Sequence, residues 1–159
     1  MMRWKQLAGD HTHKNIGGNM LLARIVICGI FFFRTCIQAT AADKEYVKLY
    51  KQGIAANKKG DLDEAIRFYS RAISLKTDSS ALYYVRGRAY SQNGQYDKAV
   101  SDLTRAITLK PGYAEAYNHR GVTCIGKGDK QKALADFRKA CELGSKNGCA
   151  NVDKFKKEK

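Results

Sequence analysis

The sequence has little of what marks a fibrous, a linker-like or a disulfide-built protein. One proline among 159 residues excludes a collagen-like chain or a proline-rich linker. Five cysteines are too sparse for a small scaffold held mainly by disulfides, so a hydrophobic core has to stabilise the fold, although one or two bridges stay open. The longest uncharged apolar run, residues 25–33, is short of the roughly 20 residues that a transmembrane helix needs.

What the sequence does contain is enough apolar material for one folded domain and a strong basic excess. Hydrophobic residues make up 44% of the chain, and 29 Lys+Arg against 15 Asp+Glu give a formal charge of +14. Residues 43–159 keep a net charge of +10, spread along the chain. Because no nucleic-acid motif accompanies this charge, we expect a solvated exterior or an acidic partner and no specific nucleic-acid binding; weak attraction to anionic membranes or nucleic acid stays open.

The first 19 residues are polar and have no apolar period. We interpret residues 1–19 as a disordered lead, or as a misassigned translation start, because Met20 stands where a signal sequence would begin. His11 and His13 lack the further ligands that a zinc site needs, so we expect no metal there.

Residues 20–42 have the three parts of a secretory signal. Arg24 precedes the apolar run over 25–33, and Ala39-Thr-Ala41 is a small-x-small cleavage triplet. Arg34 is an irregular charge within this pattern. The segment predicts an exported protein, and the alternative is an uncleaved N-terminal membrane anchor.

From residue 43 onward the chain repeats itself every 34 residues. The ladders are Gly53, Gly87 and Gly121; Gly60, Gly94 and Gly128; Ala65, Ala99 and Ala133; Ala72, Ala106 and Ala140; and Leu75, Leu109 and Leu143. Such a period is the signature of a repeat architecture.

Within one period the pattern predicts two helices and a tight turn. Apolar residues recur at helical spacing in residues 80–93 and again in 97–109, and Gly94 between them suits the left-handed conformation that ends a helix. The small residues Gly87 and Ala99 would let the two helices approach closely. Pro111-Gly112 ends the second helix.

Charged residues 16 positions apart indicate an ion pair inside each hairpin. Arg86 is followed by Asp102 and Arg120 by Asp136, whereas the first repeat has Gln52 and an uncharged partner position at Phe68. We assign these pairs a structural role.

With its glycine, tyrosine and alanine positions, the 34-residue unit resembles the tetratricopeptide repeat family, and the run Ala114-Glu-Ala-Tyr-Asn-His-Arg-Gly121 is most similar to the family pattern. The resemblance implies an all-α, short α-solenoid of three helix-turn-helix repeats, plus a short capping helix with a basic tail. The expected boundaries are 46–79, 80–113, 114–147 and 148–159. Ala56 and Cys124 replace the aromatic seen at Tyr90, so the first and third repeats are expected to pack less fully.

The resemblance also implies a function, because the family binds proteins or peptides in a concave groove formed by the first helix of each repeat. The groove positions carried over to this sequence are Tyr50, Lys51, Ile54, Lys58, Tyr84, Arg88, Gln92, Asn118, His119 and Val122, with Val47, Glu115 and Ile125 beside them. Tyr50, Tyr84 and Asn118 fall in register and would present two aromatic faces and an amide, while the basic side chains would meet a carboxylate. The alternative is that both tyrosines pack between helices.

Chaperone-tail-binding relatives hold a terminal carboxylate with Lys, Asn and Arg residues in this groove. Tyr50 and Ile54 replace the first members of that set here, so we do not predict chaperone-tail recognition.

The spacing of Cys141 and Cys149, with seven residues between them, resembles the bridged hairpins of secreted Sel-like repeat proteins. That resemblance implies a disulfide if the protein is exported. Cys124 would then be a buried, unpaired thiol, and without export all three would be free thiols.

No catalytic pattern is present in the sequence. No Ser, Cys or carboxylate set surrounds His119, which we interpret as a solvated groove residue, and phosphate loops and paired Cys-x-x-Cys motifs are absent. We therefore expect no enzyme, no cofactor and no metal.

The sequence favours an exported, periplasmic protein-protein interaction module that binds a peptide or partner protein in its groove, in the bacterial envelope. The alternatives are a scaffold for envelope complexes, anchored in the inner membrane through residues 20–42, and a cytosolic basic adaptor that contacts RNA or acidic proteins.

Overall fold

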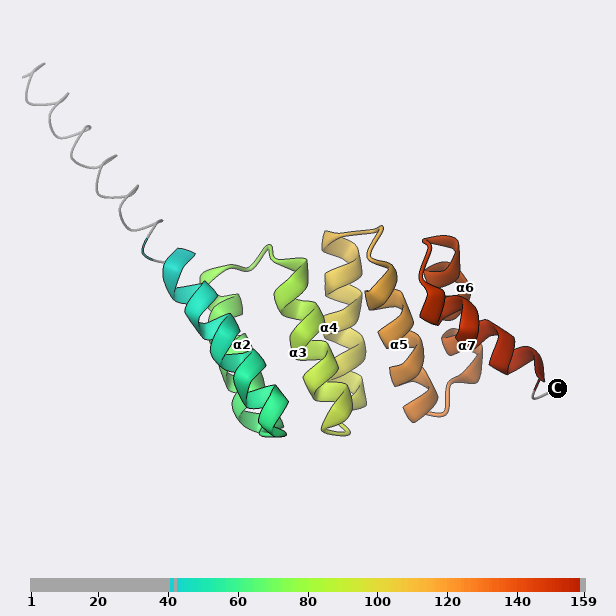
Figure 1. The fold of residues 1–159 in the computed structure, drawn as a ribbon, viewed down its shortest axis with the longest axis horizontal. Helices are drawn as coiled ribbons and strands as arrows, with labels where there is room; N and C mark the ends of the chain where they lie inside the picture. Colours follow the sequence, from blue (N-terminus) through green and yellow to red (C-terminus); the bar gives the residue numbers. More distant parts are fainter. Residues whose placement is uncertain (1–40, 42, 158–159) are drawn as a thin grey trace, which may run out of the picture. The chain divides into compact units, whose positions relative to one another are not determined.

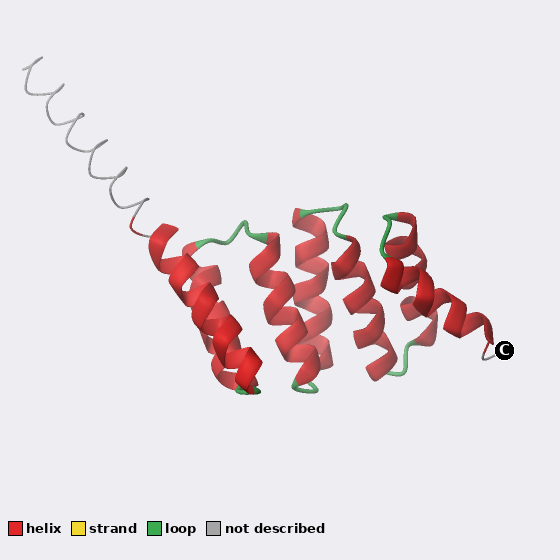
Figure 2. Cartoon of the chain, viewed as in Figure 1, coloured by secondary structure: helices red, strands yellow, loops and turns green. Residues whose placement is uncertain are grey.

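The computed structural model describes residue 41 and residues 43–157, and all regular elements in this part are helices (Figures 1 and 2). A first helix covers residues 43–59. It is followed by α2 (Leu62–Leu75), α3 (Ser80–Gln92), α4 (Tyr96–Leu109), α5 (Ala114–Gly126), α6 (Lys130–Glu142) and α7 (Lys146–Lys157). The predicted lead and signal, apart from residue 41, lie outside the described residues. The all-α stack of helix hairpins predicted from the 34-residue period is confirmed.

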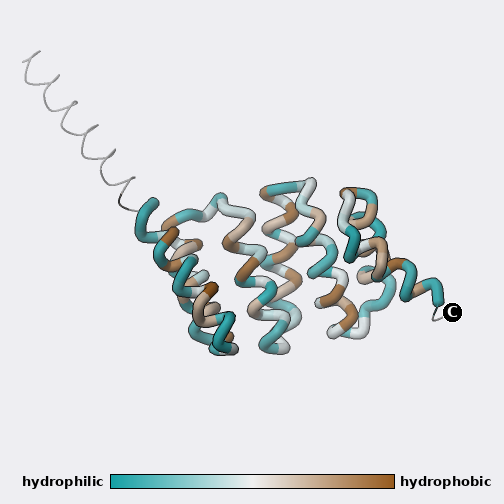
Figure 3. The backbone as a smooth tube through the Cα atoms, viewed as in Figure 1, coloured by the Kyte–Doolittle hydropathy of each residue, from teal (hydrophilic) through white to brown (hydrophobic). Residues whose placement is uncertain are grey.

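The helices of residues 43–157 pack in chain order, as Figure 1 shows, and form two layers. Each helix from α2 to α6 contacts the next one along the chain, and α5 also contacts both α3 and α7. Therefore α3, α5 and α7 share one layer, and α4 and α6 lie in the other. Hydrophobic and hydrophilic positions alternate along the helices (Figure 3), as expected where one face of a helix is buried.

Small residues set the distance between the two helices of each hairpin. Ala99 and Ala133 are completely buried on the second helices. A Cβ atom at Gly121 would lie 2.6 Å from Cε1 of Phe137, and one at Gly87 would lie 2.9 Å from Cγ of Leu103. The bulky residue that fills the space beside each glycine is itself repeated every 34 positions, as Tyr69, Leu103 and Phe137.

The turns inside the hairpins depend on a backbone conformation that favours glycine. Gly94, at φ +71°, has the left-handed conformation predicted for it, and Gly60 and Gly128 adopt similar angles. Gly144, at φ +86°, makes the same kind of turn between α6 and α7.

The predicted ion pairs form, and the arginine of each pair also donates a hydrogen bond to the preceding repeat. Arg86 donates two hydrogen bonds to the carboxylate of Asp102, at 2.7 and 2.8 Å, and a third to Oγ of Ser70 on α2, at 3.0 Å. Arg120 bonds Asp136 in the same way and donates to Oγ1 of Thr104 on α4, at 3.0 Å. Each arginine therefore connects three helices from two successive repeats.

The closing helix begins at Lys146, two residues before the predicted position, because Ser145 caps it by accepting a hydrogen bond from the Gly148 amide, at 3.2 Å. Val152 and Phe155 on this helix pack against the cluster of Cys124, Ala133 and Phe137. Cys124 is thus buried rather than loosely packed, and this burial raises the pKa of its thiol.

Cys141 and Cys149 lie as a close pair across the turn between α6 and α7. Their Cα atoms are 4.6 Å apart, which is within the range of disulfides. None of the helices in the described part of the chain combines the length and the apolar character of a membrane-spanning segment.

We expect Gly121→Ala to destabilise the protein by about 1–3 kcal/mol, because the new methyl group overlaps the Phe137 ring and lies 3.1 Å from the Ala133 carbonyl oxygen. Urea unfolding measures the change. Gly112→Ala is the matched control, since nothing lies within 4 Å of the added carbon there. Equal stabilities of the two variants would contradict the close approach of α5 and α6.

Candidate functional site

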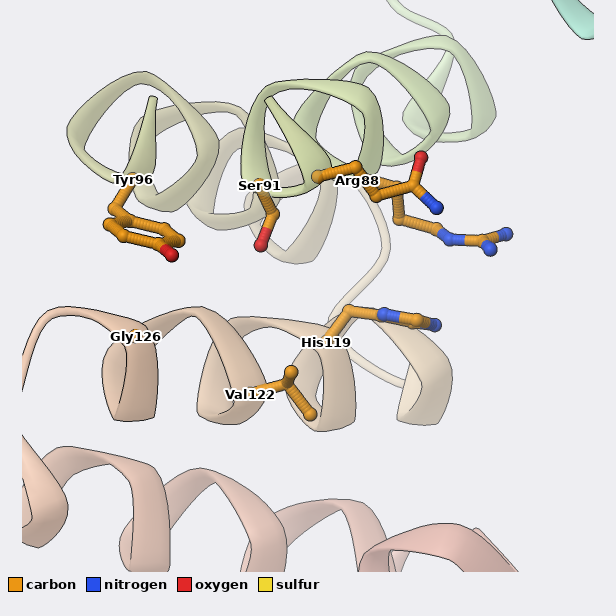
Figure 4. Close-up of a pocket in the computed structure, with 7 residues that line it drawn as sticks. Arg88, Ser91, Tyr96, His119, Val122 and Gly126 are labelled. Atoms are coloured by element: carbon orange, nitrogen blue, oxygen red, sulfur yellow. The ribbon is translucent and has the colours of Figure 1, made fainter. Parts of the chain in front are cut away.

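A pocket of about 340 Å³ opens between α3 and α5, on the layer that the sequence predicts to carry the groove. Figure 4 shows the side chains of Arg88, Ser91 and Tyr96 on one side of the pocket and those of His119 and Val122 on the other. Four predicted groove residues meet here: Arg88, Gln92, His119 and Val122.

Three lining residues were not predicted from the sequence: Ser91, Tyr96 and Gly126. A Cβ atom at Gly126 would lie 2.7 Å from Cε1 of Tyr96, so the absence of a side chain there admits the tyrosine ring. One feature of the sequence could have indicated this contact. Gly126 lies inside a predicted helix, and the equivalent position of the preceding repeat is Gln92, so this glycine does not belong to the repeat pattern.

Next to this pocket lies a cluster of aromatic rings around Tyr84. The Tyr84 ring is 4.9 Å from that of Tyr113 and 5.5 Å from that of His119, which it meets edge to face. The guanidinium of Arg88 lies over the Tyr84 ring, 5.7 Å from its centre. Tyr84 is half-buried, so it packs between helices and also contributes to the exposed face.

Burial controls the charge states in this cluster. It raises the pKa of Tyr113 to about 12 and raises that of Tyr84, so both phenols stay neutral to a higher pH than an exposed tyrosine does. Burial, and secondly the charge of Arg88, lowers the pKa of His119 to about 4. His119 is therefore a neutral, half-buried residue and not the solvated one expected from the sequence, and Arg88 is the cation of the pocket.

The predicted residues of the first helix lie outside this pocket. Tyr50 and Ile54 are half-buried in clusters that join the first repeat to α3, and the Tyr50 ring is 6.3 Å from that of Tyr69. Lys51 and Lys58 are exposed. Burial is the main cause of the raised pKa of Tyr84, and among the smaller causes Glu115 contributes more than Tyr50 does.

Asn118 has a different place from the one predicted. It is only 7% exposed, and its Oδ1 accepts a hydrogen bond of 2.9 Å from Nδ2 of Asn151 on α7. The amide expected to face a ligand in register with Tyr50 and Tyr84 instead connects α5 to α7. The residue one turn further along α5, Val122, is 46% exposed.

Two family models match most of the repeat region. A model described as "TPR repeat" matches residues 48–94, and one described as "Tetratricopeptide repeat" matches residues 84–148. Comparison with curated proteins returned no match.

Solved tetratricopeptide-repeat domains have the same fold. The chain is 25% identical to the Arabidopsis OM64 TPR domain, with a TM-score of 0.70, covering 74% of this chain and 99% of that one. It is 27% identical to the second TPR domain of human RPAP3, solved in complex with the HSP70 peptide SGPTIEEVD, with a TM-score of 0.68 and coverage of 72% and 98%. The Sgt2 TPR domain from Aspergillus fumigatus gives 27% identity, a TM-score of 0.68 and coverage of 72% and 78%.

The low pKa of His119 predicts a pH dependence of stability. The unfolded histidine takes up a proton near pH 6.5 and the folded one only near pH 4, so this residue's contribution is complete above pH 6.5 and is lost as the pH falls toward 4. We expect His119→Gln to flatten the free energy of unfolding against pH between 6.5 and 4, as measured by urea titrations. A wild-type His119 resonance that titrates near pH 6.5 by NMR would refute the low pKa.

Proposed function

Because residues 48–148 of this chain belong to the tetratricopeptide-repeat family, we propose that it is a protein-interaction module that binds an extended segment of a partner protein on the layer formed by the first helix, α3 and α5. The observation that carries the proposal is the pocket between α3 and α5, where the Arg88 guanidinium lies beside the neutral Tyr84 and His119 rings.

Arg88 is suited to binding an acidic ligand because no carboxylate within residues 43–157 neutralises its charge. Within residues 43–157 it forms no ion pair, in contrast to Arg86, two positions away, which is bound to Asp102. A partly desolvated guanidinium that is held over an aromatic ring loses little freedom when it pairs with a carboxylate of a ligand. Lys51 and Lys58 on the first helix are exposed and carry further positive charge. The favoured partner segment is therefore acidic.

Peptide binding by solved relatives supports the proposal, since the RPAP3 domain is described in complex with a peptide. It does not extend to chaperone tails. Tyr50 and Ile54 occupy the places where tail-binding relatives carry the first polar ligands of the terminal carboxylate, and Asn118 is engaged by Asn151.

We expect Arg88→Glu to weaken partner capture without unfolding the protein, because the reversed charge repels an acidic segment. The measurement is affinity purification from the native cells with quantitative mass spectrometry, alongside circular dichroism. The matched control is Arg138→Glu, which makes the same charge change on the exposed face of α6. Unchanged capture by Arg88→Glu, or an equal loss in Arg138→Glu, would rule out this assignment of Arg88.

We propose further that the protein is exported to the bacterial periplasm and that Cys141 and Cys149 are disulfide-bonded there. The signal-like pattern of residues 20–42 and the close approach of the two cysteines support this proposal. A bond at this position would stabilise the end of the solenoid by roughly 2–3 kcal/mol in the chain-entropy picture.

Intact mass of the native protein tests export and the disulfide together. We expect an N-terminus near residue 42 or 43, one thiol that labels under denaturing conditions without reduction, and two more that label only after reduction. A chain that is cleaved near residue 42 or 43 but gains no labelled thiols on reduction would refute the disulfide and leave export standing. A full-length chain with every thiol free would refute both and favour a cytosolic adaptor, while an uncleaved chain in the membrane fraction would favour the anchored scaffold.

A further inference from the structure

A second pocket, of about 380 Å³, lies between α5, α6 and α7, at the C-terminal end of the solenoid. Its lining consists of apolar and basic side chains and one amide: Val122, Ile125, Lys130, Phe137, Asn151, Lys154 and Phe155. Val122 lines this pocket and the pocket beside Arg88, so the two are consecutive along the same face of α5.

The walls of the second pocket expose apolar surface that the fold does not use. Ile125 is 39% exposed and Val122 is 46% exposed, whereas Phe137 beneath them is almost completely buried, with its ring 5.9 Å from that of Phe155. Covering such side chains removes apolar area from water, at about 25 cal/mol per Å². A bulky apolar side chain of a ligand would gain this free energy by entering the pocket.

The two lysines of the pocket have charges that are not neutralised within residues 43–157. Neighbouring basic residues are paired: Lys127 with Asp97, Lys132 with Asp129, Lys139 with Glu142 and Lys156 with Asp153. Lys130 and Lys154 form no ion pair in this part of the chain. The pocket therefore combines an apolar lining with two cations that have no carboxylate partner among residues 43–157.

The α7 wall of the pocket is held in place by several contacts. Asn151 is hydrogen-bonded to Asn118, and Gly148 packs so closely on α6 that a Cβ atom there would lie 2.7 Å from Cβ of Ala140. The rings of Phe137 and Phe155 hold α7 at a further point, and the proposed Cys141–Cys149 disulfide would add another. Because its walls are already fixed, the pocket loses little conformational entropy when it binds a ligand.

We propose that this second pocket binds one bulky apolar side chain from an acidic segment of a partner protein, with the flanking carboxylates paired to Lys130 and Lys154. The inference deepens the proposed function, because it adds an apolar anchoring position to the acidic segment bound near Arg88. The match of apolar lining and unpaired cations favours an acidic protein segment over nucleic acid, which would bring phosphates but no aliphatic anchor.

The experiment uses the full chain and a synthetic nonapeptide with one central leucine and four glutamates on each side. Its ends are acetylated and amidated, so that no terminal carboxylate contributes, and an attached fluorophore reports binding by anisotropy. Two further peptides replace the leucine by alanine or all glutamates by glutamine. The protein variants are Lys154→Glu, Ile125→Ser, Arg88→Glu and, as the matched control on the same helix, Lys157→Glu.

We expect measurable binding of the leucine peptide, and a loss of at least about fivefold with either altered peptide and with Lys154→Glu or Ile125→Ser. Lys157→Glu should change the affinity by less than about twofold, because Lys157 does not line the pocket. A further decrease with Arg88→Glu would also support the inference, since it would place the peptide along both pockets.

Three results would overturn the inference: no binding of the leucine peptide, equal binding of the alanine peptide, or equal losses in Lys154→Glu and Lys157→Glu. A loss confined to Arg88→Glu would overturn it as well and would leave the proposed function standing. Conversely, if native partner capture does not depend on Arg88 while the peptide still depends on Lys154 and Ile125, the pocket stands and the assignment of Arg88 fails.

Discussion

The close approach of the two helices in each hairpin is the constraint on which the other features of this structure depend. At Gly87 and Gly121 no Cβ atom fits without moving Leu103 or Phe137, and Ala99 and Ala133 are fully buried on the opposing helices. With the backbones this close, a single large side chain per repeat fills the space between them. Other positions of α3 and α5 are then not needed for packing inside the hairpin. Arg88 and Val122 are two such positions, and both line the pocket between these helices.

The paired arginines fix how one repeat sits on the next. Arg86 and Arg120 each bind a largely buried aspartate on the second helix of their own repeat and a hydroxyl on the second helix of the repeat before. Replacing such a pair by apolar residues often costs little stability, but its bidentate geometry allows few alternatives. These contacts therefore contribute more to the register between repeats, and so to the alignment of α3 with α5, than to the total free energy of folding. The first repeat has no such arginine, and there the aromatic packing of Tyr50 and Tyr69 takes its place.

The alignment of α3, α5 and α7 brings together two kinds of pocket surface. Near α3 the surface is aromatic with one cation, and burial keeps the neighbouring His119 neutral, so the positive charge there belongs to Arg88. Near α7 it is apolar, with two lysines that form no ion pair within residues 43–157. Val122 lies between them and lines both pockets, so α5 contributes to both surfaces.

The sequence by itself determined the architecture of this protein. A 34-residue period, left-handed glycines and small residues at fixed spacing specify local geometry and helix contact, so the hairpins, the turn at Gly94 and the Arg86–Asp102 pair could be predicted from residue types and positions. The resemblance to the repeat family also placed Arg88, Gln92, His119 and Val122 on the groove, and these four line one pocket. Only the tertiary structure decided which of those side chains stay available. Asn118 is engaged by Asn151, which lies 33 residues later on α7, Tyr96 enters the pocket because Gly126 on another helix leaves room, and burial against Tyr84 neutralises His119. The accessibility and charge of a side chain depend on contacts between helices, and a periodic pattern within one repeat does not record them.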